Sequence, residues 1–116
     1  MPSVHIFASQ GRFSSFEAIR KFIDPIYTAD GGQIDSEFIR EVGVDEFEPM
    51  CIEAIHSPVT KPLRLLLERA SYSDQWLPHF AVSCEADSAI CVFEPNVVLR
   101  PEASSLRYCG ALFYQL

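Results

Sequence analysis

The sequence has few of the residues on which nucleic-acid binding or membrane insertion depend. Its 116 residues include 9 Lys and Arg against 16 Asp and Glu, and the net charge of -7 disfavours a protein that coats phosphates. No run approaches the roughly 18 apolar residues that span a membrane. The N-terminal segment MPSVHIFASQ has no basic region and no long apolar stretch, so no signal peptide is expected. These absences predict a cytoplasmic protein without direct nucleic-acid or membrane contacts.

Catalytic and metal-binding motifs are also missing. The sequence has no Gly-x-Ser-x-Gly, His-Glu-x-x-His, Walker or dinucleotide-binding pattern. It has no Cys-x-x-Cys, its three His lie far apart, and its four Cys have apolar neighbours, which is typical of buried free thiols. We therefore expect no catalytic residues, no metal and no cofactor. A small enzyme that uses Cys51, for example with His56, or a pair of carboxylates is the catalytic alternative.

The composition is that of one globular domain. Hydrophobic residues make up 48% and aromatic residues 12% of the chain, and no repeat, low-complexity tract or linker interrupts it. A chain of this length buries about two-thirds of its unfolded surface, so it needs no metal or disulfide to fold. Residues 1–116 are predicted to form a single domain.

The order of apolar patterns predicts an α+β fold, a mostly antiparallel sheet packed by about four helices. Strands are expected at 4–8, 49–55, 89–93 and 108–114, and 97–99 either extends the third strand or forms another. Gly110 interrupts the last strand and marks either a bulge or a close backbone approach. Helices are expected at 15–23 behind a Ser14-x-x-Glu17 capping box, between Ser36 and Gly43, at 63–69, and from Ser73 to about residue 84. Asp-Gly-Gly at 30–32 predicts a turn, and Pro58 and Pro62 are expected to bracket another.

The negative charge is concentrated in one segment. Residues 30–53 contain eight acids and one base, Arg40, and the rest of the chain has eight of each. Such a run forms either a solvated face or a binding surface for a basic partner. The acids are Asp30, Asp35, Glu37, Glu41, Asp45, Glu46, Glu48 and Glu53.

Three aromatic residues are candidates for contacts with that partner. Phe47 lies between carboxylates in DEFEP, a pattern similar to an apolar interface centre with a charged rim. Tyr72 and Trp76 flank a predicted helix start in SYSDQWLP. Exposed Tyr and Trp dominate binding hot spots, and the alternative is that this pair forms a hydrophobic staple and a core tryptophan.

Motifs along most of the chain resemble the immunity protein 22 family of bacterial polymorphic-toxin systems. The matching segments are VHIF, FSSFEAI, YTADGGQIDSEFIREVGVD, FEP, IEAIH, ASYSDQWLP and AICVFE. The most specific of them are the Asp-Gly turn with its Ser-x-Phe helix and the SYS…LP motif. None is catalytic, and the family supplies no functional residues that can be transferred to this sequence.

The resemblance implies a small non-enzymatic antitoxin that binds and blocks one cognate toxin domain. An acidic surface suits a basic toxin, and nucleases are basic because they hold phosphates. The leading expectation for the partner is therefore a nuclease toxin that acts in the cytoplasm, and a deaminase or an NAD-consuming toxin is the alternative partner. The alternative is a small interaction or ligand-binding domain unrelated to toxins. Its oligomeric state is left open.

Overall fold

The core of the fold is a four-stranded antiparallel sheet. A computed structural model describes all 116 residues, and the strand order in this sheet is β5-β6-β1-β8. The strands are β1 (Ser3–Ser9), β5 (Ile52–Pro62), β6 (Glu85–Phe93) and β8 (Arg107–Phe113). Together with the helices on its two faces, this sheet confirms the predicted α+β class.

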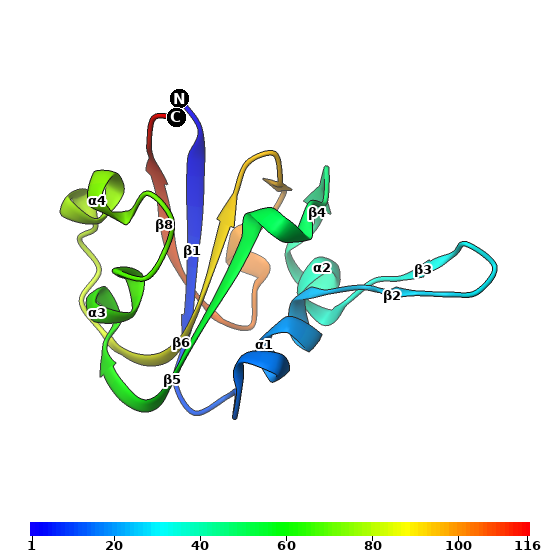
Figure 1. Cartoon of the computed structure of the whole chain (residues 1–116), viewed down its shortest axis with the longest axis horizontal. Coiled ribbons are helices and arrows are strands. Elements are labelled where there is room, and N and C mark those ends of the chain that lie inside the picture. The colour runs from blue at the N-terminus through cyan, green and yellow to red at the C-terminus, as the bar shows by residue number, and fades with distance from the viewer.

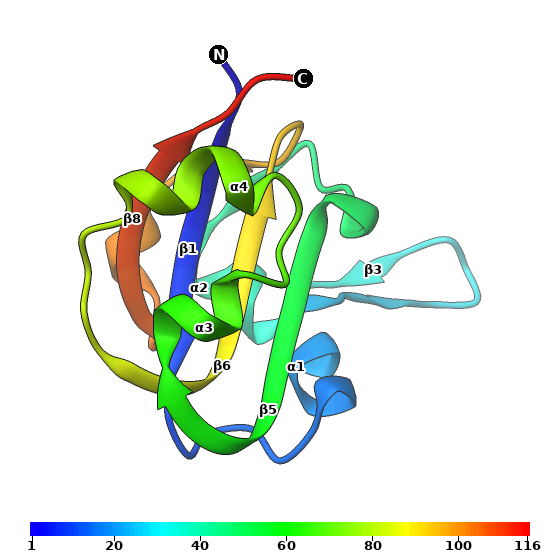
Figure 2. The ribbon, with the colours of Figure 1, turned by 60° about the vertical axis from the view of Figure 1, so that its left-hand side comes forward.

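Helices cover both faces of the sheet. In Figure 1 the sheet lies between α3 and α4 on one side and α1 and α2 on the other, and Figure 2 shows α3 and α4 in front of the strands. The helices are α1 (Phe16–Ile23), α2 (Glu37–Val42), α3 (Leu63–Leu67) and α4 (Ser73–Trp76). Three 3-10 helices, η1 (Pro49–Cys51), η2 (Leu77–His79) and η3 (Pro101–Ala103), complete the helical structure.

Strand β6 has an uninterrupted apolar run because both of its faces are buried. Ala89, Cys91 and Phe93 belong to the hydrophobic cluster beneath α3 and α4. Ile90 and Val92 belong to the cluster beneath α1 and α2. Side chains alternate between the faces of a strand, so a strand covered on both sides reads as continuously hydrophobic. The prediction of a central strand at 89–93 is confirmed.

Short polar signals set the ends of the first two helices. The Ser15 hydroxyl accepts a hydrogen bond from Ala18 N at 3.1 Å, so Ser15 is the N-cap of α1. The expected capping box at Ser14 is wrong by one residue. Ser36 caps α2 as predicted, and α2 ends at Gly43, which has a φ of 67° that favours glycine.

Two small two-stranded sheets lie outside the main sheet. Strands β2 (Ile26–Tyr27) and β3 (Gln33–Ile34) pair with each other, and the Asp-Gly-Gly turn lies in the loop that joins them. This hairpin projects from the body of the protein (Figure 1). Strands β4 (Val44–Asp45) and β7 (Val97–Val98) form the second pair, so residues 97–98 form a separate strand.

Three predicted elements differ from the structure. The strand expected at 49–55 begins only at Ile52, because Pro49–Cys51 form the 3-10 helix η1. Strand β5 continues through Pro58 to Pro62, with an irregularity in its pairing to β6, where a turn was expected. A proline is accepted there because β5 is an edge strand, where a missing N–H leaves no gap in the sheet. The helix expected from Ser73 to about residue 84 ends early, because Pro78 lies in a 3-10 turn and Phe80 is extended. None of the helices is long and apolar enough to cross a bilayer.

Candidate partner-binding surface

The eight carboxylates of segment 30–53 follow one side of the molecule and end on β5. They lie along the path from the β2–β3 hairpin through α2, β4 and η1. Five side chains are exposed and three are partly buried. The exposed carboxylates are those of Asp30, Asp35, Glu37, Asp45 and Glu46.

Six of the eight carboxylates have hydrogen-bond or ion-pair partners within the chain: those of Asp30, Asp35, Glu37, Glu41, Glu48 and Glu53. Glu37 forms an ion pair with Arg12, with 2.7 Å between Oε2 and Nη2. Glu41 accepts a hydrogen bond from Ser105 N at 2.8 Å, and Glu48 caps η1 by accepting from Met50 N at 3.0 Å. The charge that the sequence places in this segment is therefore partly used to hold the fold together.

Asp45 and Glu46 are different because neither side chain has a hydrogen-bond or ion-pair partner within the chain. Asp45 ends β4 and Glu46 begins the turn that follows it, both side chains are exposed, and Glu46 has a φ of 56°. The next residue, Phe47, is half-buried and packs against the hydrophobic cluster beneath α1 and α2. This turn thus presents two free charges beside an anchored aromatic ring, a combination suited to contact with a basic partner.

The two other aromatic candidates lie on the opposite side of the sheet. Trp76 is 0% exposed, and its Nε1 donates to Ser71 O at 3.0 Å. Its predicted role as a partner contact is wrong, because the buried indole ring has no surface to offer, and the core alternative is correct. Tyr72 is 41% exposed and stacks on Tyr114 with ring centroids 4.8 Å apart. In Figure 1 the helix that follows Tyr72, α4, and the β2–β3 hairpin lie on opposite sides of the sheet.

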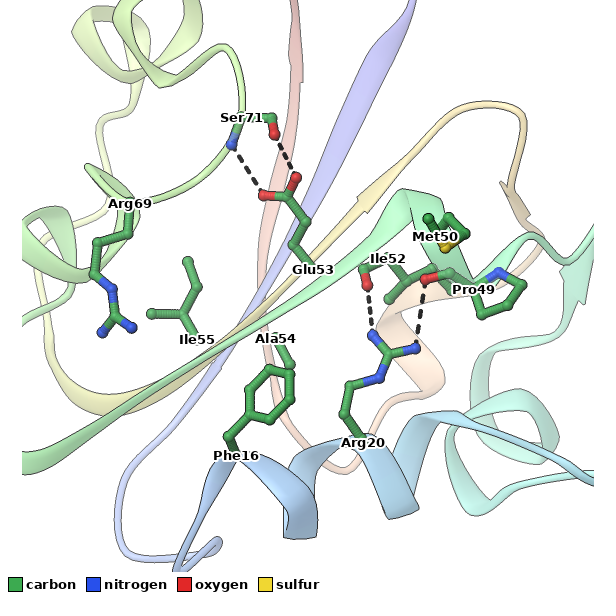
Figure 3. Close-up of a pocket in the computed structure, with 10 residues that line it drawn as sticks. All are labelled: Phe16, Arg20, Pro49, Met50, Ile52, Glu53, Ala54, Ile55, Arg69 and Ser71. Carbon is green, nitrogen blue, oxygen red and sulfur yellow. Dashed lines mark hydrogen bonds between the residues drawn. The ribbon is translucent and has the colours of Figure 1, made fainter.

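An open groove of about 550 Å³ runs along the outer edge of β5 (Figure 3). One wall is formed by Phe16 and Arg20 of α1, and the other by residues 69 and 71 after α3. Glu53 points from β5 to the second wall, where it accepts hydrogen bonds from the N–H and the hydroxyl of Ser71. Glu53 is thereby the one acid of the segment that contacts the α3–α4 side.

Two arginines bind carbonyl groups on the open edge of β5. Arg20 donates to the Ile52 carbonyl oxygen at 2.5 Å and also pairs with Asp24. Arg69 donates to the His56 carbonyl oxygen at 3.1 Å. The backbone groups of alternate residues point the same way, so Ala54 is the residue between these two whose backbone also points outward. An edge protected in this way is a poor site for the addition of another strand.

Burial makes two of the four cysteines poor nucleophiles. Burial raises the pKa of the Cys91 thiol far above its usual range and raises that of Cys109 to about 11. A nucleophilic cysteine needs a lowered pKa. Cys51 packs against the cluster beneath α3 and α4, whereas His56 Nδ1 lies 3.3 Å from Ser88 Oγ. No group of three or more Cys, His, Asp or Glu side chains is arranged to hold a metal ion.

The α+β domain thus presents two carboxylates without internal partners, those of Asp45 and Glu46, at the exposed end of β4. The sequence model of the family described as Immunity protein 22 matches residues 4–115. The chain therefore belongs to the Immunity protein 22 family, and this membership indicates an antitoxin that binds a cognate toxin. No curated protein and no solved structure matches the chain.

Proposed function

We propose that this protein neutralises a basic nuclease toxin in the cytoplasm by binding it through the acidic surface between the β2–β3 hairpin and η1. The observation that carries the proposal is the pair of free carboxylates of Asp45 and Glu46 beside Phe47. Carboxylates without internal partners keep their full attraction for a cation, whereas Glu37 and Glu41 already have partners. Nucleases carry clustered Lys and Arg because they bind phosphates.

Electrostatic attraction predicts how such a complex forms. Opposite potentials raise the association rate toward about 10⁸–10⁹ M⁻¹s⁻¹ at low salt. Added salt screens exposed charges, so the rate falls as ionic strength rises. Fast association suits an antitoxin, because a nuclease that enters the cell does damage until it is bound.

The test measures binding to the toxin domain encoded beside this gene. Asp45→Lys combined with Glu46→Lys should slow association at least tenfold at low salt, by our order-of-magnitude expectation for steering charges, and should flatten the salt dependence. Glu68→Lys with Glu85→Lys is the matched control, since both side chains are exposed, lie elsewhere and change the net charge equally. An equal effect of the two pairs would mean that net charge alone acts and that the turn is not the interface.

Cellular protection tests the antitoxin function itself. Co-expression with the adjacent toxin should restore growth, and the purified protein should stop cleavage of DNA or RNA by that toxin. Unchanged killing would refute the antitoxin function. Protection from a toxin without nuclease activity would refute only the nuclease part.

A further inference from the structure

The β2–β3 hairpin is an arm with an unusual amount of exposed apolar surface. Ile26 is 62%, Tyr27 66% and Ile34 52% exposed. The register pairs Ile26 with Ile34, so these two side chains lie next to each other on one face, and it pairs Tyr27 with Gln33 on the other. Figures 1 and 2 both show the arm projecting from the body of the protein.

Internal packing does not explain these side chains. A two-stranded hairpin is at best marginally stable in water, and apolar side chains that stay in water contribute little to folding. The residues on either side do pack, since Phe22, Ile23 and Phe38 are buried. The arm thus leaves the hydrophobic cluster at Pro25 and returns to it at Ser36, and both of these residues are buried.

The tip of the arm is held by hydrogen bonds and is negatively charged. Thr28 N donates to the Gly32 carbonyl oxygen at 2.9 Å, and Gly31 N donates to the Thr28 carbonyl oxygen at 3.1 Å. Hydrogen bonds from the Thr28 hydroxyl and from Gly32 N hold Asp30 in place and lower the pKa of its carboxyl group. A carboxylate fixed in this way needs little further ordering when it binds.

The negative charge of the arm indicates which kind of partner it binds. Residues 25–36 include the acids Asp30 and Asp35 and no Lys or Arg. Two arms from two copies of the chain would bring like charges together, which is unfavourable. A basic cleft on another protein offers both opposite charge and a concave surface for the apolar side chains.

We propose that the arm, residues 26–34, inserts into the phosphate-binding cleft of the toxin and there takes the place of the nucleic acid. This inference rests on the proposed function and names the element that blocks the active site. Asp30 lies where a backbone phosphate would bind. The Tyr27 ring offers a flat face like that of a base, and bases stack on exposed faces in single-strand binding channels. The six residues from Pro25 to Asp30 make five steps of about 3.3 Å and so span at most about 16 Å, enough to reach into a cleft.

The test compares arm and control variants of the full chain against the toxin domain encoded beside this gene. Ile26→Ser, Tyr27→Ser and Ile34→Ser together should weaken binding by about 30-fold or more, the loss expected when a binding hot spot is removed. Val59→Ser with Leu65→Ser removes similarly exposed apolar side chains from β5 and α3 and should leave binding unchanged. Circular dichroism should show that both variants remain folded.

A second variant distinguishes insertion of the arm into the phosphate-binding cleft from contact with the toxin outside that cleft. Asp30→Lys should abolish the competition between this protein and a short single-stranded DNA for the toxin, even when the complex still forms. If the wild-type protein binds the toxin and both arm variants bind it equally tightly, the arm proposal is overturned and the antitoxin function stays intact. Failure of the wild-type protein to bind the toxin would refute both. Sedimentation that shifts from dimer to monomer on loss of the apolar side chains would assign the arm to self-association and overturn the proposal.

Discussion

At the residue scale, the start of α1 depends on one hydroxyl group. Two adjacent serines are available, and only Ser15 accepts the hydrogen bond from Ala18 N. Ser15→Ala should lower the free energy of unfolding by about 1 kcal/mol, the usual effect of losing an N-cap. Ser14→Ala is the control and should change it by less than about 0.5 kcal/mol. Urea denaturation of both variants decides which serine is the cap, and a larger loss at Ser14 would contradict the structure.

His5 makes stability depend on pH near neutrality. Burial lowers the pKa of His5 below the value of 6.5 of a free imidazole, and Glu94 partly offsets this effect. The ring also lies beside Tyr108, with 2.8 Å between Nδ1 and the phenolic oxygen. The unfolded chain therefore takes up a proton at a higher pH than the folded one, so stability falls as the pH drops below about 6.5.

The measurement for His5 is the midpoint of urea unfolding between pH 7.5 and pH 5.5. His5→Gln should lose less stability than the wild-type protein over this range, since it has no imidazole to protonate. His79→Gln, at an exposed position, serves as the control and should follow the wild-type curve. Parallel curves for the wild type and His5→Gln would show that His5 does not cause the acid sensitivity.

At the scale of elements, the sequence predicted the helices and strands whose apolar spacing and end signals indicate the same element. Strand β6 and helices α1 and α2 are of this kind. The predicted turn at 58–62 was wrong because the prolines lie in an edge strand, a position that only the sheet order reveals. The helix after Ser73 was overextended because Trp76 and Phe80 match helical spacing while lying in a short helix and an extended segment.

Strand β8 contains a bulge near Gly110, which is one of the two alternatives that the sequence left open for this glycine. Opposite His5 and Phe7 of β1 lie Ala111 and Tyr108, so β8 has one extra residue in this stretch. Gly110 lies there with a φ of 101°, and a Cβ would meet no atom within 4 Å. Gly110→Ala should lower the free energy of unfolding by about 1–2 kcal/mol through backbone strain alone.

Thermal and urea unfolding of Gly110→Ala measure this strain. Ala111→Ser, at the exposed neighbouring position, is the control and should stay within about 0.5 kcal/mol of the wild type. If the glycine variant were equally stable, the positive φ at position 110 would not be needed for the bulge.

At the scale of the whole molecule, the candidate site was only partly predictable. The sequence located the acidic segment but not its internal partners, because Arg12 and Ser105 are distant in the chain and reach Glu37 and Glu41 only after folding. Within the arm, the sequence singled out Asp30 as a candidate and missed the exposed side chains of Ile26, Tyr27 and Ile34. The two-residue strands of the arm have no periodic pattern, and the Asp-Gly-Gly turn indicated a loop without showing that it projects from the body.

The two hydrophobic clusters should unfold together because the same strands build both. Leu66 belongs to the cluster beneath α3 and α4, and Phe38 to the one beneath α1 and α2. Leu66→Ala should lower the free energy of unfolding by about 2–5 kcal/mol and Phe38→Ala by about 3–5 kcal/mol. Trp76, the only tryptophan, lies in the first cluster, so its fluorescence reports that layer alone.

Urea unfolding of Phe38→Ala, followed by Trp76 fluorescence and by circular dichroism, tests whether the two clusters unfold together. Since β1 and β6 carry side chains of both clusters, the loss at Phe38 should move the Trp76 fluorescence transition and the far-ultraviolet circular dichroism transition to the same lower urea concentration. Leu65→Ala, at an exposed position on α3, controls for a change outside the clusters. A circular dichroism transition that moves while the fluorescence transition stays in place would mean that the α1–α2 layer unfolds on its own. The arm and the acidic turn would then be attached to the less stable layer, and a partner bound there would stabilise that layer alone.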